Sequence, residues 1–271
     1  MLNASTQNSS TQNSYTQQNL LTFLHPLNER MRFFLRLSYL FQQAKHSIDG
    51  ASIYDSHNAL RSILDIMTFM NQQDLKKEVL KELERINQKL SPLQDSPQIK
   101  HGTLANILAS LDKLHTELHA INGPIAQELR DNEFLKVVQQ RANIAAGFSE
   151  FDPPVYCHWL MQPAETRIAD LNSWLSCFES LYASIALILN MIRESATPKT
   201  LVAENGNYQQ SLDSKLPYQL LIINLPYNSP YYAEVSGGKH RFTIRFMDTT
   251  TTPRPAQTGN AVEFQLSNCV L

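Results

Sequence analysis

The sequence predicts an α+β protein in which a mainly helical bundle domain is followed by a small antiparallel β-sheet domain. The first observation is that apolar residues recur every three or four positions from Pro26 to about Ser195, a spacing typical of amphipathic helices. The second is that this period changes to two after Thr197-Pro198, with turn residues between the alternating runs. Helices and strands in separate parts of a chain are typical of α+β domains. We therefore expect a helical domain over residues 20–196 and a β domain over residues 197–271.

Residues 1–19 consist almost wholly of Ser, Thr, Gln and Asn and contain no charged side chain. The pentapeptide Ser5–Ser9 is repeated at once as Ser10–Ser14. Such a segment buries too little apolar area to offset the entropy of ordering, which predicts a disordered polar extension. The alternative is a polar tract that associates with itself.

The helical region divides into segments that each carry one apolar face. The first begins after His25-Pro26, and the others span about 57–70, 75–90, 104–121, 125–142 and 164–195. In the segment 104–121, Leu and Ile alternate at spacings of three and four, which favours near-parallel or antiparallel helix packing. The segment 164–195 is the longest, and as one helix it would extend roughly 45–50 Å, as the spine of a bundle.

The β region is divided by two turn signals. Asn205-Gly206 is a dipeptide typical of hairpin turns, and Gly237-Gly238 separates two alternating runs. The expected strands span about 218–225, 231–236, 239–247 and 261–266.

Composition excludes several classes of protein. The 23 Lys+Arg and 25 Asp+Glu residues give a net charge of −2, which excludes a globally basic nucleic-acid binder but not a local basic patch. With 8 Gly and neither a G-x-G-x-x-G nor a complete P-loop motif, the common nucleotide enzymes are not indicated. Cys157, Cys177 and Cys269 form no C-x-x-C pair, so no disulfide framework or zinc ribbon is indicated. Since neither a secretory signal nor a bilayer-spanning run is visible, we expect a soluble intracellular protein.

Two groups of basic residues need a partner. Arg32 and Arg36 lie four residues apart on the first helix, where like charges repel, so an acidic partner is needed within the chain or outside it. In the strand 239–247, the side chains of His240, Phe242, Ile244 and Phe246 should point to one side and those of Lys239, Arg241, Thr243 and Arg245 to the other. Arginine side chains suit the binding of carboxylates. The alternative is a solvated outer sheet face and a surface helix.

His115 and His119 lie at positions i and i+4 of a helix, which is a spacing compatible with metal binding. The motif is not H-E-x-x-H, because Glu117 falls midway and on the opposite side. The structural interpretation is that both are polar residues beside the helix seam, and the functional alternative is a metal-dependent enzyme. A second alternative is a nucleic-acid adaptor that uses the basic strand.

Several motifs follow one another along the chain between residues 20 and about 266. They are His25–Arg32 with Leu35-Arg36; Leu80–Leu83; Phe151-Asp152, Pro154 and Trp159-Leu160; Ile192-Arg193 with Ser195-Ala196; Asn205-Gly206 with Tyr208-Gln209; and Val235–Lys239 with Arg241-Phe242 and Ile244–Phe246. In this order they resemble the motifs of the ZapD family of bacterial cell-division proteins. The family's basic, Gly-rich stretch after the fifth helix corresponds here to residues 139–147, which carry less positive charge.

The resemblance implies a homodimer joined through the helical part and no enzymatic activity, and we expect no cofactor and no metal. It also implies a partner, the C-terminal tail of the tubulin-like division GTPase FtsZ. A dimer would hold two tails and so cross-link FtsZ filaments into bundles at the midcell division ring, in the cytoplasm, with no nucleic-acid or membrane binding. We expect the tail to dock on a cationic surface formed by Arg32, Arg36, Arg193, Lys239, Arg241 and Arg245.

Overall fold

The computed structural model describes residues 20–71, 75–95, 101–142, 144, 153–238, 240–250 and 254–271. The predicted extension 1–19, most of the stretch 143–152 and Lys239 lie outside the described residues. The chain divides into two compact units. We call them the β unit, formed by residues up to Arg32 together with Met191–Leu271, and the helical unit, formed by Phe33–Asn190.

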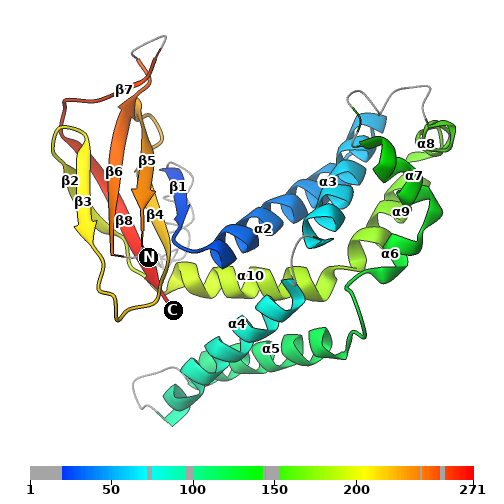
Figure 1. The fold of residues 1–271 in the computed structure, drawn as a ribbon, viewed down its shortest axis with the longest axis horizontal. Helices are drawn as coiled ribbons and strands as arrows, with labels where there is room; N and C mark the ends of the chain where they lie inside the picture. The colour runs from blue at the N-terminus through cyan, green and yellow to red at the C-terminus, as the bar shows by residue number, and fades with distance from the viewer. Residues whose placement is uncertain are drawn as a thin grey trace, which may run out of the picture. The chain divides into compact units, whose positions relative to one another are not determined.

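The α+β class is confirmed, since helices precede most of the strands (Figure 1). The helices are α2 (Glu29–Ile48), α3 (Ile53–Asn71), α4 (Leu75–Leu90), the 3-10 helix η2 (Ser91–Asp95), α5 (His101–Ala120), α6 (Gln127–Asp131), α7 (Glu133–Ala142), α8 (Pro154–Leu160), α9 (Ala164–Ser176) and α10 (Glu179–Glu194). The strands are β1 (Leu20–Pro26), β2 (Lys199–Ala203), β3 (Asn207–Ser211), β4 (Tyr218–Pro226), β5 (Tyr231–Gly237), β6 (Arg241–Asp248), β7 (Ala256–Gln257) and β8 (Val262–Val270).

The core of the helical unit is formed by the apolar faces that the sequence predicts. The expected inward face of α3 is confirmed, since Leu60, Ile63, Leu64 and Met67 are all buried. Aromatic rings join α2 to its neighbours: Phe33 packs edge-on against Phe69 of α3, and Phe41 packs edge-on against Phe178.

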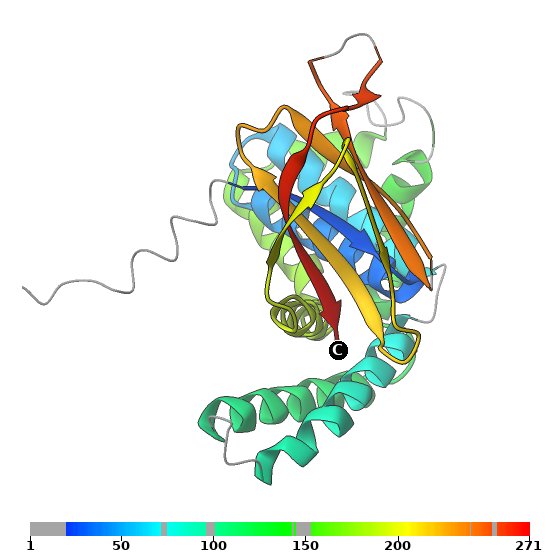
Figure 2. The ribbon, with the colours of Figure 1, turned by 90° about the vertical axis from the view of Figure 1, so that its left-hand side faces the viewer.

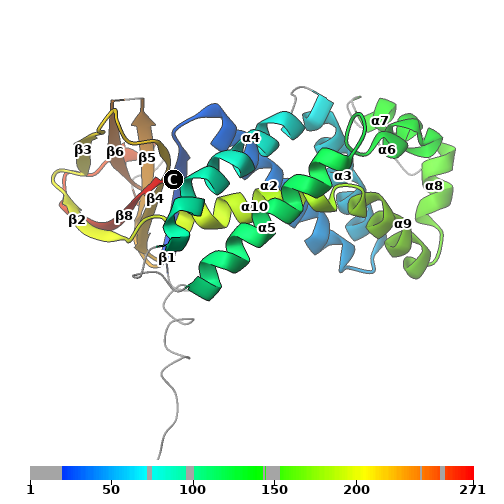
Figure 3. The same ribbon diagram turned by 90° about the horizontal axis from the view of Figure 1, so that it is seen from below.

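Helices α4 and α5 run side by side as an antiparallel hairpin within the helical unit (Figure 3). Their buried seam contains Val79, Leu83 and Ile86 from α4, facing leucines of α5. Leu104, Leu111 and Leu118 of the predicted α5 seam are buried. The expected side-by-side packing of this helix is therefore confirmed.

Two segments predicted as single helices are interrupted, so these predictions were wrong. The segment 125–142 divides at Asn132, whose side-chain Oδ1 accepts a hydrogen bond of 3.0 Å from the Leu135 amide and so caps α7. The segment 164–195 divides into α9 and α10, which are bent by 65°. Near this break the Ser176 hydroxyl and the Cys177 thiol both donate to the Ser173 carbonyl. Side chains that bond the backbone in this way weaken a helix, although neither Gly nor Pro marks the position.

In the part of the chain that the structure describes, no single helix is both long and apolar enough to cross a bilayer. The bent α9–α10 pair meets those two criteria only when its helices are taken together.

The β unit consists of two antiparallel sheets (Figure 2). One sheet has the order β1-β4-β8-β2, and the other has the order β3-β6-β5, with β7 paired to β6. Strand β1 comes from the region predicted to be helical, and all its residues pair with β4, from Leu20↔Pro226 to Pro26↔Leu220. Helix α2 begins at Glu29, so the expected start after His25-Pro26 is confirmed, and the apolar run Leu20–Pro26 before it extends the sheet at its edge.

The turn at Asn205-Gly206 is present, with positive φ values of 51° and 63°. It does not close a hairpin ladder, because β2 pairs with β8 in one sheet and β3 pairs with β6 in the other. The Gly206 carbonyl accepts from the Phe246 amide at 2.8 Å, and the Gly206 amide donates to the Asn260 carbonyl at 2.9 Å. These bonds hold the turn through which the chain passes from β2 in one sheet to β3 in the other.

Side chains from both sheets fill the space between them. The largest buried side chains of this core are Phe242 and Phe246 of β6 and Phe264 of β8. The Phe246 and Phe264 ring centroids lie 4.9 Å apart. The β6 strand thus has one face in this core, which fixes the direction of its other side chains.

Candidate functional site

Strand β6 presents arginines on the outer face of its sheet. Phe242, Ile244 and Phe246 are buried, whereas Arg241 and Arg245 are exposed, so the predicted alternation is confirmed for these residues. His240 was expected on the inner face but is exposed, because β6 begins only at Arg241. Lys239 lies outside the described residues.

The two arginines of β6 differ in their neighbours. Arg245 lies opposite Glu234 of β5, and its Nη2 is 3.1 Å from the Glu234 Oε2. Both side chains are about half-exposed, so the ion pair adds little stability but offsets the Arg245 charge locally. Arg241 lies opposite Ser211 of β3, and no carboxylate of the described residues forms an ion pair with it. The positive charge of Arg241, unlike that of Arg245, is therefore not offset by a carboxylate of the described residues.

A cavity of about 470 Å³ lies on the same face, which we call the arginine face. Its lining combines Arg241 with hydroxyl, amide, imidazole and backbone groups, and none of the described residues that line it has a carboxylate: Gln209, Ser236, Gly237, Gly238, His240, Arg241, Phe242 and Thr243. Gln209, Thr243 and Ser236 form one row across β3, β6 and β5. The period-two pattern of the three strands could have identified these polar neighbours, which the sequence analysis missed.

Arg32 lies near one end of the β5–β6 pair. The Asn28 Oδ1 caps α2 by accepting from the Met31 amide at 2.9 Å, and Arg32 follows in the first turn. Burial, and then the Arg32 charge, lower the pKa of His25, so Arg32 and His25 are close. The His25 Nε2 in turn lies 3.5 Å from the place where a Cβ on Gly237 would be. Arg32, His25 and the Gly237-Gly238 turn are thus neighbours within the β unit.

Arg32 has an acidic partner within the chain, which is one of the two possibilities that the sequence left open, whereas Arg36 has an aromatic partner that was not expected. The Arg32 Nη2 lies 3.8 Å from the Glu29 Oε1. The Arg36 Cζ lies 5.4 Å from the centroid of the Phe69 ring, in a cation–π contact. Arg36 belongs to the helical unit, so the structure does not join it to the arginine face.

Arg193 lies beside β8 rather than β6. The Ser195 hydroxyl, two residues after Arg193, accepts a hydrogen bond of 3.0 Å from the Val270 amide of β8. Burial raises the pKa of the Cys269 thiol to about 11, and the Arg193 charge lowers it in part. Of the predicted cationic surface, Arg241 and Arg245 therefore share one face and Arg32 lies near its end. Arg193 and Arg36 have other surroundings.

His115 and His119 stack on each other with ring centroids 6.1 Å apart. Among the residues that the structure describes, no His, Cys, Asp or Glu joins them to form a group of three potential metal ligands. Among these residues, the pair thus has no third ligand of the kind that zinc sites in proteins use.

Comparisons with known proteins agree on one family. A family model described as "ZapD: Cell division protein" matches residues 35–245. A protein named Cell division protein ZapD from Methylococcus capsulatus is 38% identical over 254 residues, which cover 94% of this chain and 100% of that protein. Proteins of the same name from Coxiella burnetii and Chromobacterium violaceum are 36% and 35% identical over 251 residues, or 92% of this chain and 97% and 99% of those proteins.

Proposed function

Because the chain belongs to the ZapD family of cell-division proteins, we propose that it binds the C-terminal tail of FtsZ and, as a dimer, bundles FtsZ filaments. The observation that supports tail binding is the arginine face, where Arg241 lines a cavity and no carboxylate of the described residues pairs with it or lines that cavity. The relatives are named as cell-division proteins and not as enzymes, so we propose an adaptor that works by binding at the division ring.

Arg241 is the centre of the proposed site. Its guanidinium can bind a carboxylate through two parallel hydrogen bonds, and the hydroxyls of Ser236 and Thr243 can bond the peptide backbone. Arg245 lies on the same strand face, where Glu234 offsets its charge in part, and Arg32 lies near the Gly237-Gly238 end of the β5–β6 pair. The tail would dock from solvent, so its affinity should fall as salt concentration rises.

A charge-reversal series tests this site with a labelled FtsZ tail peptide and fluorescence anisotropy. Arg241→Glu should weaken binding at least about tenfold, since one charge-assisted bond is worth that much. Arg245→Glu should weaken it less, because Glu234 already offsets that charge. Lys215→Glu is the matched control, since Lys215 is an exposed cation of the same unit that lies outside the cavity. Equal affinities for all three variants would remove the site assignment.

The other predicted residues are tested in the same series. Arg32→Glu should weaken tail binding with little change in thermal unfolding, because Arg32 and its partner Glu29 are both exposed. Arg36, Arg193 and Lys239 stay predictions, and reversal of each shows whether the docking surface extends beyond the arginine face.

Bundling is proposed to depend on two sites in one dimer. One site holds one tail weakly, but two linked sites that face two filaments gain affinity from effective concentration. Mixing wild-type protein with an excess of Arg241→Glu protein should produce dimers with one working site. These should bind the tail peptide yet reduce the FtsZ that sediments as bundles. If the mixture bundled filaments as well as wild type does, cross-linking by dimers would be wrong.

A further inference from the structure

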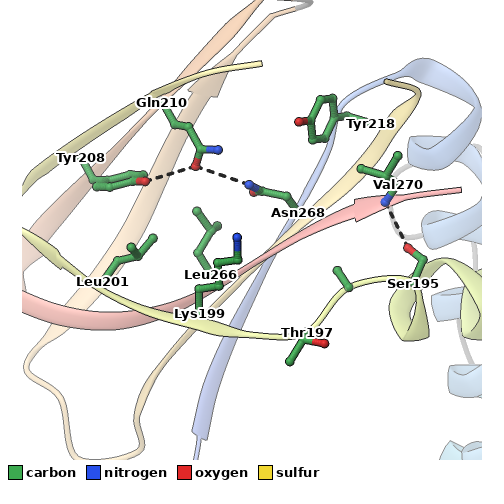
Figure 4. A pocket seen from close by; sticks show the side chains of 11 residues that line it. Ser195, Thr197, Lys199, Leu201, Tyr208, Gln210, Tyr218, Leu266, Asn268 and Val270 are labelled. Carbon is green, nitrogen blue, oxygen red and sulfur yellow. Dashed lines mark hydrogen bonds between the residues drawn. The ribbon is translucent and has the colours of Figure 1, made fainter. Parts of the chain in front are cut away.

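A second cavity of the β unit lies at the opening between its two sheets (Figure 4). Its volume is about 580 Å³, which is within the range of small-ligand sites. It is lined from both sheets and from the segment between α10 and β2, by Ser195, Ala196, Thr197, Lys199, Leu201, Tyr208, Gln210, Tyr218, Leu266, Asn268 and Val270. We call it the β2–β3 cavity, since it opens between these two edge strands.

A hydrogen-bond network fixes the amide of Gln210 in this cavity. The Gln210 Oε1 accepts from the Tyr208 hydroxyl at 3.1 Å and from the Asn268 Nδ2 at 3.4 Å. Because both bonds hold the oxygen, the Nε2 of the same amide points toward the open side, where Figure 4 shows it facing Tyr218. Within the described residues Nε2 donates to no acceptor, and the Asn268 Oδ1 is buried without a partner. Among the described residues, the Gln210 NH₂ therefore lacks an acceptor and the Asn268 Oδ1 lacks a donor.

Two more donors face the same space. The Lys199 ammonium and the Tyr218 hydroxyl both point into the cavity in Figure 4. Neither forms an ion pair or side-chain hydrogen bond with another described residue, and the lining contains no Asp or Glu. An ammonium, an amide NH₂ and a phenol that converge without an anion favour a carboxylate as the missing acceptor.

The remaining lining is apolar. Leu201, Leu266 and Val270 provide hydrocarbon surface beside the donors. We propose that the β2–β3 cavity binds a carboxylate carried on an apolar body, as in an acylated amino acid or the C-terminal residue of a peptide. Strand β2 is the last strand of its sheet, so the backbone of an extended peptide has a free edge beside the cavity.

This site is separate from the arginine face and does not rest on the proposed function. Gln209 lines the cavity of the arginine face and Gln210 lines the β2–β3 cavity. Successive residues of a strand point to opposite sides, so strand β3 lies between the two cavities.

The test uses the full-length protein and isothermal titration calorimetry. The probes are N-acetyl-leucine and the peptide acetyl-Ala-Ala-Leu, each as the free acid and as the C-terminal amide. The acids should bind at least about tenfold more tightly than the amides, since only the acids offer a charged acceptor. Tighter binding of the peptide acid than of N-acetyl-leucine identifies a peptide end as the ligand. Equal affinities for the peptide acid and N-acetyl-leucine identify a small carboxylate as the ligand.

Two variants connect that binding to the cavity. Lys199→Gln should reduce the affinity for the acids about tenfold, whereas Lys215→Gln, at an exposed lysine outside the cavity, should leave it unchanged. Gln210→Glu keeps the shape and still accepts from Tyr208 and Asn268, so it should fold but lose acid binding through repulsion. The proposal would be overturned if acid and amide bound equally, or if no probe bound at millimolar concentration. It would also be overturned if folded Lys199→Gln and Gln210→Glu proteins bound the acids as wild type does.

Discussion

Arg167 of α9 offers a direct test of how the helical unit is held together. Its side chain is 5% exposed, and no carboxylate of the described residues pairs with it. Instead its Nε donates to the Ser56 hydroxyl at 3.0 Å and its Nη2 donates to the Ala51 carbonyl at 2.9 Å. Its Nη1 donates to the Leu160 carbonyl at 3.2 Å and also to the Gln162 carbonyl. One guanidinium thus joins the start of α3 to the connection between α8 and α9.

Arg167→Leu keeps much of the side-chain volume but removes all the donors. Four hydrogen bonds at about 1 kcal/mol each give an expected loss of about 4 kcal/mol in the free energy of unfolding. Arg167→Lys should lose about half as much, because it keeps the charge but not the planar set of donors.

The assay is urea unfolding followed by far-ultraviolet circular dichroism, at one fixed protein concentration. The control is Arg61→Leu, which removes an exposed arginine of α3 whose Nε lies 3.7 Å from the Asp65 carboxylate. Its expected cost is below about 0.5 kcal/mol, as for other helix-surface pairs. A loss below about 1 kcal/mol for Arg167→Leu would refute the reasoning, since the carbonyl groups would then be satisfied without the arginine.

Three further outcomes are expected. Glu234→Gln frees Arg245 and should tighten binding of the FtsZ tail about twofold to threefold by fluorescence anisotropy; weaker binding would mean that Glu234 itself helps to hold the tail. Gly206→Ala should destabilise the β unit by more than about 1 kcal/mol, because φ is +63° and the new Cβ would lie 2.5 Å from the Thr258 carbonyl oxygen. Gly259→Ala, which has open space for a Cβ, is its control in thermal unfolding, and equal costs would contradict this explanation. Burial, and then the Arg61 charge, lower the pKa of His57 below 6.5. The unfolded chain therefore binds this proton first, and stability should fall as the pH drops below about 6.5. His57→Asn should reduce this loss of unfolding free energy at low pH, measured by urea titrations at several pH values. If the pH dependence stayed the same, other groups would be its cause.

The sequence predicted those parts of the fold that depend on one periodicity within one segment. The inward face of α3 and the alternation of β6 follow from such patterns, and both are confirmed. The break after Ser176 was missed because it depends on side-chain bonds to the backbone and not on Gly or Pro. The pairing of β1 was missed because its partner strand lies about 200 residues away in the sequence.

The candidate site was predictable to a similar extent. The outward direction of Arg241 and Arg245 follows from the pattern of β6 alone. The ion pair of Arg245 with Glu234 depends on strand register, and the contact of Arg36 with Phe69 depends on helix packing. Neither register nor packing angle can be obtained from residue spacing within one element.

The pairing of β1 with β4 has a consequence for how the protein is made. β1 is synthesised before residues 27–217, so its partner strand does not yet exist when β1 is made. At about 5–20 residues per second, the nascent chain carries this unpaired apolar strand for roughly 10 to 40 s while the helices emerge. We expect the helical unit to fold during translation and the β unit only after the last strand is released.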